Sequence, residues 1–134
     1  MNMIYVVYFH LATMLCAFML GAYLMFSQKG GPAHRLAGKV FSVTIIVSAL
    51  ASLFMHSTLG PTFLGRFGLL HLLSLWVLFV VPQAWLASRR HHVKKHRLSM
   101  IGIYVGAIGI AGTFAVMPPG RILHDWLFGW LSAL

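Results

Sequence analysis

The sequence predicts an all-α integral membrane protein, a four-helix bundle whose helices run up, down, up and down. Of its 134 residues, 60% are hydrophobic and only 8% are charged, against about 45–50% and about 25% in soluble proteins. Four long apolar runs separated by short polar breaks complete the pattern. This composition excludes a soluble enzyme, a disordered tail and a disulfide scaffold. We interpret the whole chain as a single transmembrane domain.

Each predicted span is bounded by residues that break an apolar helix. The spans cover about residues 4–26, 36–55, 67–87 and 98–117. The first has no positive n-region and no Ala-x-Ala site, so we expect a retained helix rather than a signal peptide. The breaks are the turn 27–32, residues 59–62, the basic stretch 89–97 and Pro118-Pro119-Gly120. Pro82 falls inside the third span, where a kink is expected.

The cations predict how the chain sits in the membrane. Lys29, Arg35 and Lys39 belong to the first connection, and five further cations lie between residues 89 and 97. Only Arg66 and Arg121 fall on the other side. The positive-inside rule then places both basic connections in the cytoplasm and both termini outside a bacterial inner membrane. Because the basic stretch 89–97 lies between two spans, we interpret it as a signal for membrane orientation and expect no nucleic-acid partner. Residues 122–134 are expected to form a short interfacial helix.

The near-absence of acids excludes several kinds of site. Asp125 is the only acid in the sequence, so chemistry based on paired carboxylates is excluded and oxygen-ligated metal sites are disfavoured. Cys16 is the only cysteine, and it can form neither an internal disulfide nor a Cys/His zinc motif. Eight histidines remain as the polar side chains in surplus.

Histidines recur at matching positions in two halves of the chain. His34-Arg35-Leu36 opens the second helix and His96-Arg97-Leu98 opens the fourth. His10 and His71 lie early in the first and third helices. The halves therefore resemble two parallel two-helix repeats. Because helices one and three, and helices two and four, lie diagonally in such a bundle, each repeat position predicts a pair of facing imidazoles.

Two imidazoles facing each other across an apolar bundle suit low-spin haem b. The predicted iron ligands are His34 with His96 and His10 with His71, and His56 at the end of the second helix competes for the outer pairing. The haem propionates would pair with arginines, for which the candidates are Arg35, Arg97, Arg66 and Arg121.

Other interpretations of these residues stay open. His10 and His71 can instead bond a serine such as Ser74 or a backbone carbonyl. His10 with Met14 gives a soft donor set, and copper is therefore the rival cofactor. The glycines from Gly102 to Gly112 suit either the approach of a flat macrocycle or plain helix packing.

The segments His-Arg-Leu-Ala-Gly-Lys-Val (34–40) and His-Arg-Leu-Ser-Met (96–100), with Arg121 after the fourth helix, resemble a bacterial four-helix membrane family known as domain of unknown function 2306. The histidine layout is also similar to that of four-helix di-haem b-type cytochromes. That resemblance implies electron transfer between quinol, haem and an acceptor, with His34/His96 and His10/His71 as axial ligands. The extra histidine, His56, departs from the pattern.

These observations predict a membrane electron-transfer protein with one or two bis-histidine haems, embedded in lipid and exchanging electrons with quinone. Oxidoreductase activity follows only if a substrate reaches a haem edge. The alternative is a non-catalytic accessory or assembly subunit that packs on a larger respiratory complex or on a second copy. A third interpretation is a small-solute carrier with a path formed by a dimer; proton- or sodium-coupled transport is disfavoured because buried acids are absent.

Overall fold

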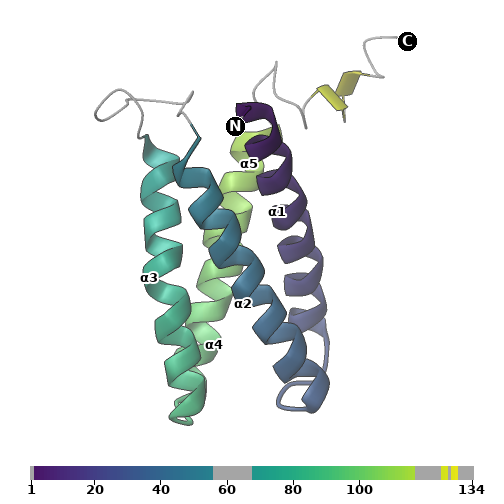
Figure 1. The fold of residues 1–134 in the computed structure, drawn as a ribbon. Helices are drawn as coiled ribbons and strands as arrows, with labels where there is room; N and C mark the ends of the chain where they lie inside the picture. The colour runs from purple at the N-terminus through teal and green to yellow at the C-terminus, as the bar shows by residue number, and fades with distance from the viewer. Residues whose placement is uncertain (1, 56–67, 117–124, 127, 130–134) are drawn as a thin grey trace.

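All secondary structure in the described part of the chain is helical. The computed structural model describes residues 2–55, 68–116, 125–126 and 128–129, without the side chains of residues 69 and 114–116. Three long helices come first, α1 (Met3–Phe26), α2 (Pro32–Leu53) and α3 (Leu69–Arg89). A fourth long helix follows in three segments, α4 (Val93–Gly102), η1 (Ile103–Gly109) and α5 (Ile110–Val116). The predicted all-α fold with four helices is confirmed (Figure 1).

Three of the helices are long and apolar enough to cross a membrane, namely α1, α2 and residues Leu70–Arg89 of α3. The fourth helix is divided by η1, a π-helical segment. Its three segments together cover residues 93–116, and at about 1.5 Å per residue they extend roughly 35 Å. That length matches a hydrocarbon core of about 30 Å.

Tight turns join the helices into two hairpins. Gly30, with φ of 84°, lies in the turn before α2, and Pro32 occupies the first turn of α2, where its missing N–H costs nothing. After α3, the His91 N–H bonds to the Ser88 carbonyl and the His92 N–H to the Ala87 carbonyl. His91 itself has φ of 59°. These two bonds form the Schellman motif, which ends a helix with one left-handed residue.

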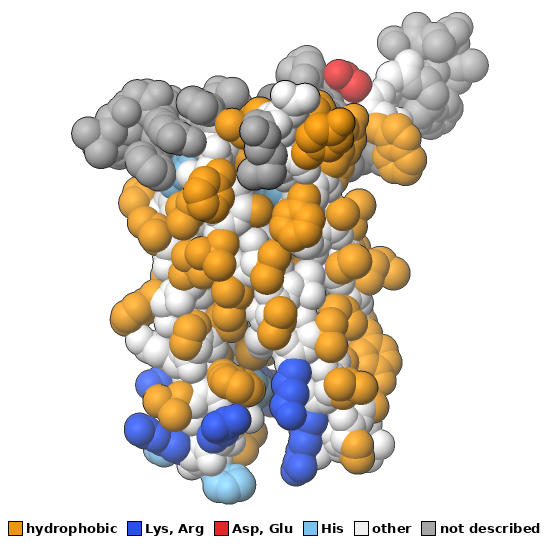
Figure 2. Space-filling view, in the orientation of Figure 1, with side chains coloured by type: hydrophobic (Ala, Val, Ile, Leu, Met, Phe, Trp, Pro, Cys, Tyr) orange, Lys and Arg blue, Asp and Glu red, His pale blue; other side chains and the backbone are white. Residues whose placement is uncertain are grey.

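Both hairpins turn at the same end of the bundle, as two parallel repeats require (Figure 1). Lysine and arginine side chains gather at this end, and the single acid, Asp125, lies at the other (Figure 2). We call them the basic end and the opposite end. From the basic end, α2 crosses the bundle and ends beside the start of α3 (Figure 1), while it keeps contact with α1 through Ser48.

A small apolar core holds the helices together, and a large apolar surface surrounds it. Residues of α1, α2, α3 and η1 form the core: Ala17, Phe41, Ile45, Ala49, Val77, Val81, Ile103, Ala107 and Ile108. Large apolar side chains cover the outside (Figure 2); Phe26 and Phe79 are 91% and 66% exposed. An apolar surface of this extent matches a bilayer as the surrounding solvent.

Glycines let two aromatic rings enter the helix interfaces. The Tyr104 ring of η1 lies against Gly21 of α1, where any Cβ would overlap it. The Trp76 ring of α3 lies 3.4 Å from the Cβ position of Gly106 and 3.9 Å from that of Gly102. These two glycines therefore serve helix packing rather than a macrocycle.

Two helix starts differ from the predicted spans. Helix α2 begins at Pro32 rather than at about residue 36, and α4 begins at Val93 rather than at about residue 98. The basic residues 94–97 are helical because Lys and Arg are good helix formers whose long stems reach the aqueous interface from a helix end. Pro82 lies inside α3, which continues through it. The predicted C-terminal helix falls largely outside the described residues, of which 125–126 and 128–129 are helical.

Candidate metal and cofactor site

His96, in the first turns of α4, has one ring nitrogen fixed by the backbone of α3. Its Nδ1 lies 2.8 Å from the carbonyl oxygen of Ala84. Because a carbonyl only accepts, Nδ1–H is the donor and Nε2 carries the lone pair. This bond fixes both the tautomer and the orientation of the ring, as the outer hydrogen bond of a metal-ligating histidine does.

His34 lies in the first turns of α2, also at the basic end. Its Nδ1 is buried and has no hydrogen-bond partner among the described residues. His34 and His96 both lie near the starts of their helices, and α2 and α4 both start at the basic end (Figure 1). Leaving a buried ring nitrogen unpaired costs about 1–3 kcal/mol. This nitrogen is therefore an unsatisfied polar group within the described structure.

Two arginines accompany this pair. Arg35 and Arg97 directly follow the histidines, and both are exposed. Since the only acid of the chain, Asp125, lies at the opposite end (Figure 2), no carboxylate of the protein neutralises them. Their guanidinium groups are available to carboxylates of a bound molecule.

At the opposite end, His10 bonds to a serine of the neighbouring helix. Its Nδ1 lies 2.9 Å from both the carbonyl oxygen and the hydroxyl of Ser48 on α2. The Ser48 hydroxyl also donates to the His10 carbonyl at 3.4 Å. This contact ties α1 to α2 within the apolar bundle.

His71 has both ring nitrogens engaged. Its Nδ1 accepts from the Gly68 N–H at 3.1 Å, which caps the start of α3, and its Nε2 donates to the Met55 carbonyl at 2.9 Å. The His71 ring is also buried. His10 and His71 thus bond to other groups, and in this arrangement the pair does not fit a haem. The interpretation that they bond a serine or a backbone carbonyl describes the observed contacts.

A band of hydroxyl groups at this end was not anticipated. Ser52 of α2 lies one turn after Ser48, and its hydroxyl is 2.5 Å from that of Ser74 on α3. The Ser52–Ser74 contact, the His10–Ser48 contact and the His71–Met55 contact together form a polar band that joins α1, α2 and α3. The spacing of Ser48 and Ser52, four residues apart on a predicted helix, is the signal that could have revealed it.

The remaining predicted site residues, His56, Arg66 and Arg121, lie outside the described residues. Within the described part of the chain, no group of three or more His, Cys, Asp or Glu side chains could hold a metal ion. At the basic end, the described candidates are the two histidines His34 and His96 and the two arginines that follow them.

The comparisons with known proteins identify a family by its sequence. The family model described as "Predicted membrane protein (DUF2306)" matches residues 7–130. Among curated proteins, and likewise among solved structures, none matches the chain.

Proposed function

The chain belongs to the DUF2306 family of predicted membrane proteins, and we propose that it is a membrane electron-transfer protein carrying a b-type haem between His34 and His96 at its basic end. The single observation that carries the proposal is the hydrogen bonding of these two imidazole rings, each of which keeps one nitrogen without a partner among the described residues. His96 keeps Nε2 free because Ala84 holds its other nitrogen, and His34 holds a buried nitrogen without a partner.

The residues at the basic end fit a haem in their chemistry. A haem would supply a one-electron carrier, and it would need two donor side chains for its iron and cations for its two propionates. His34 and His96 provide the donors from diagonal helices. Arg35 and Arg97 provide cations for which the chain has no carboxylate nearby. The Ala84 carbonyl orients the His96 ring and raises its basicity as a ligand.

The proposal is limited to one haem. Among the described residues, His10 and His71 do not offer a second bis-histidine site, because both nitrogens of His71 are occupied. The redox partner that the bilayer itself offers is a quinone. In a bacterial inner membrane, the positive-inside rule puts the basic end, and with it the haem, on the cytoplasmic side.

The test is the absorbance spectrum of protein purified from haem-replete cells. We expect a Soret band and a sharp α band on reduction, both lost in His34→Ala and in His96→Ala. The matched controls are His92→Ala, at an exposed turn of the same end, and His10→Ala at the opposite end; both are expected to keep the spectrum. A colourless wild-type preparation, or His34→Ala and His96→Ala variants that retain the low-spin bands, would remove the proposal.

A second candidate function is that of an accessory subunit of a larger membrane complex. One observation favours it: no described atom of the chain lies within 4 Å of the Cβ positions of Gly109 and Gly112. Small residues on a helix allow a second helix to approach closely. Co-purification of a larger complex with the wild-type protein, lost in Gly109→Leu but kept in Gly38→Leu, would support this function. Absence of any larger partner would exclude it.

A further inference from the structure

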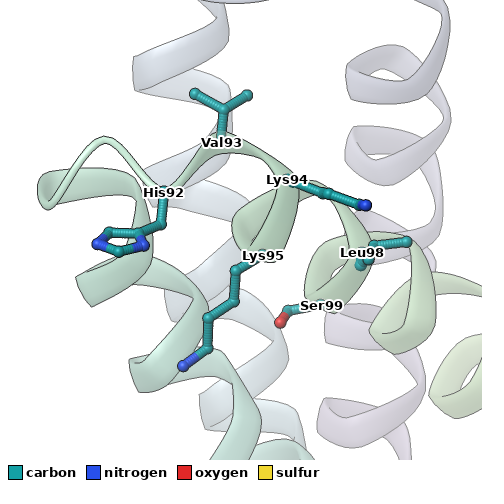
Figure 3. A pocket seen from close by; sticks show the side chains of 6 residues that line it. All are labelled: His92, Val93, Lys94, Lys95, Leu98 and Ser99. Carbon is teal, nitrogen blue, oxygen red and sulfur yellow. The ribbon is translucent and has the colours of Figure 1, made fainter.

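A hollow opens on the side of the fourth helix at the basic end (Figure 3). It has a volume of about 490 Å³, and six residues of the first turns line it: His92, Val93, Lys94, Lys95, Leu98 and Ser99. Lys94 points to the same side as Leu98, Lys95 points to the other side, and the Ser99 hydroxyl lies between them (Figure 3). Two cations and a hydroxyl thus border the same space.

The two lysines have no acidic partner within the protein. The only acid of the sequence, Asp125, lies at the other end of the bundle (Figure 2). Every other charged side chain at this end is a cation. The hollow therefore selects an anion, and the anion must come from outside the chain.

The remaining lining is apolar and exposed. Val93 is 71% exposed and Leu98 is 61% exposed. The lysines precede the apolar part of a predicted span, at the height where lipid headgroups meet the helix ends. A free inorganic anion makes no favourable contact with the apolar part of this lining, whereas a phospholipid brings both a phosphate for the lysines and hydrocarbon for the apolar side chains.

From this combination we propose that the hollow is a binding site for an anionic phospholipid. The headgroup phosphate lies between Lys94 and Lys95 and accepts a hydrogen bond from the Ser99 hydroxyl. The upper part of an acyl chain covers Leu98, which follows the lysines toward the apolar part of the helix. The site is separate from the His34/His96 pair, and its occupation does not depend on a haem.

The test is lipid retention by the purified full-length protein, measured by native mass spectrometry in a mild detergent. The protein is titrated with phosphatidylglycerol, with phosphatidylcholine and with inorganic phosphate. We expect selective retention of phosphatidylglycerol, weakened roughly 25-fold in Lys94→Gln/Lys95→Gln, from the usual contribution of a surface cation to anionic-lipid attraction. The control Lys39→Gln/Arg90→Gln removes two cations from the same end outside the hollow, and we expect it to keep most of the retention.

A second variant tests the shape of the hollow at constant charge. Ser99→Phe fills the space and keeps both lysines, and we expect it to lose the lipid as the double lysine variant does. If the double lysine variant does not fold, the lipid retention of Ser99→Phe alone tests the proposal. Equal losses in the two double variants, equal retention of phosphatidylcholine, or displacement of the lipid by phosphate at matching concentration would each overturn the proposal.

Discussion

The contact between Gly21 of α1 and the Tyr104 ring of η1 predicts that Gly21→Ala destabilises the bundle. A Cβ at Gly21 would overlap the Cδ2 and Cε2 atoms of Tyr104 and would lie 3.2 Å from Cε2 of Phe41. Phe41 is buried in the core and cannot yield. The Tyr104 ring must therefore move, although it stacks on Phe18 with the ring centroids 6.2 Å apart and bonds to the Phe18 carbonyl at 3.3 Å.

The magnitude follows from opposing terms. Inserting a methyl group into a packed interface costs about 1–3 kcal/mol, and displacing Tyr104 also weakens a stacked pair of about 0.5–1.5 kcal/mol. Replacing glycine within a helix returns about 1 kcal/mol. We expect Gly21→Ala to lower the free energy of unfolding by about 2 kcal/mol, within a range of about 0.5–3.5 kcal/mol set by these terms.

The assay is reversible unfolding in mixed detergent micelles with increasing sodium dodecyl sulfate, followed by circular dichroism. Gly38→Ala is the matched control, since Gly38 lies within α2 and no described atom comes within 4 Å of its Cβ position; we expect it to be neutral or slightly stabilising. In a Tyr104→Ala background, Gly21→Ala is expected to leave the free energy of unfolding unchanged, because the overlapping ring is absent. Equal stability of the two alanine variants, or a cost independent of Tyr104, would refute the reasoning.

Three further predictions concern a turn, a helix contact and the topology. His91→Gly is expected to raise the free energy of unfolding by about 1 kcal/mol in the same assay, because His91 has φ of 59°; a loss of stability would contradict a left-handed residue there. Ser48→Ala is expected to lower it by about 0.6–1.7 kcal/mol and to add nothing in a His10→Ala background; additive losses would show that the two residues are not coupled. In a cysteine-free background, Lys95→Cys is expected to react with an impermeant maleimide only after the cells are opened, and Asn2→Cys in intact cells; the reverse pattern would invert the orientation.

The hydropathy pattern was sufficient to predict the helices, but not where they begin. An apolar run marks the part of a helix that lies in lipid. Lys94, Lys95 and Arg97 are polar yet helical, because a helix end at the interface keeps its side chains in water while its backbone bonds stay satisfied. The start of α2 at Pro32 escaped the apolar criterion for the same reason, although proline in a first turn is a recognisable start signal.

The two ends of the bundle differ in how far their sites could be predicted. At the basic end, the repeated His-Arg-Leu segments predicted a pair formed by His34 and His96, and both residues lie near the helix starts at that end (Figure 1). At the opposite end, matching positions of His10 and His71 did not reveal their partners. Which group a buried imidazole meets depends on the rotation of each helix about its own axis. Ser48 lies in α2, outside the predicted pair of helices, and the Met55 carbonyl lies just after the end of α2.

The π-helical segment Ile103–Gly109 has a consequence for how the fourth helix can change. A π turn holds one residue more than an α turn, so α4 and α5 are set at different angular phases about a common axis. Gly102 and Gly106 meet Trp76, whereas Gly109 faces elsewhere. If the same residues re-wound into a uniform α-helix, α5 would turn by about 100° relative to α4, so that more than a quarter turn of its surface would pass from the bundle to lipid.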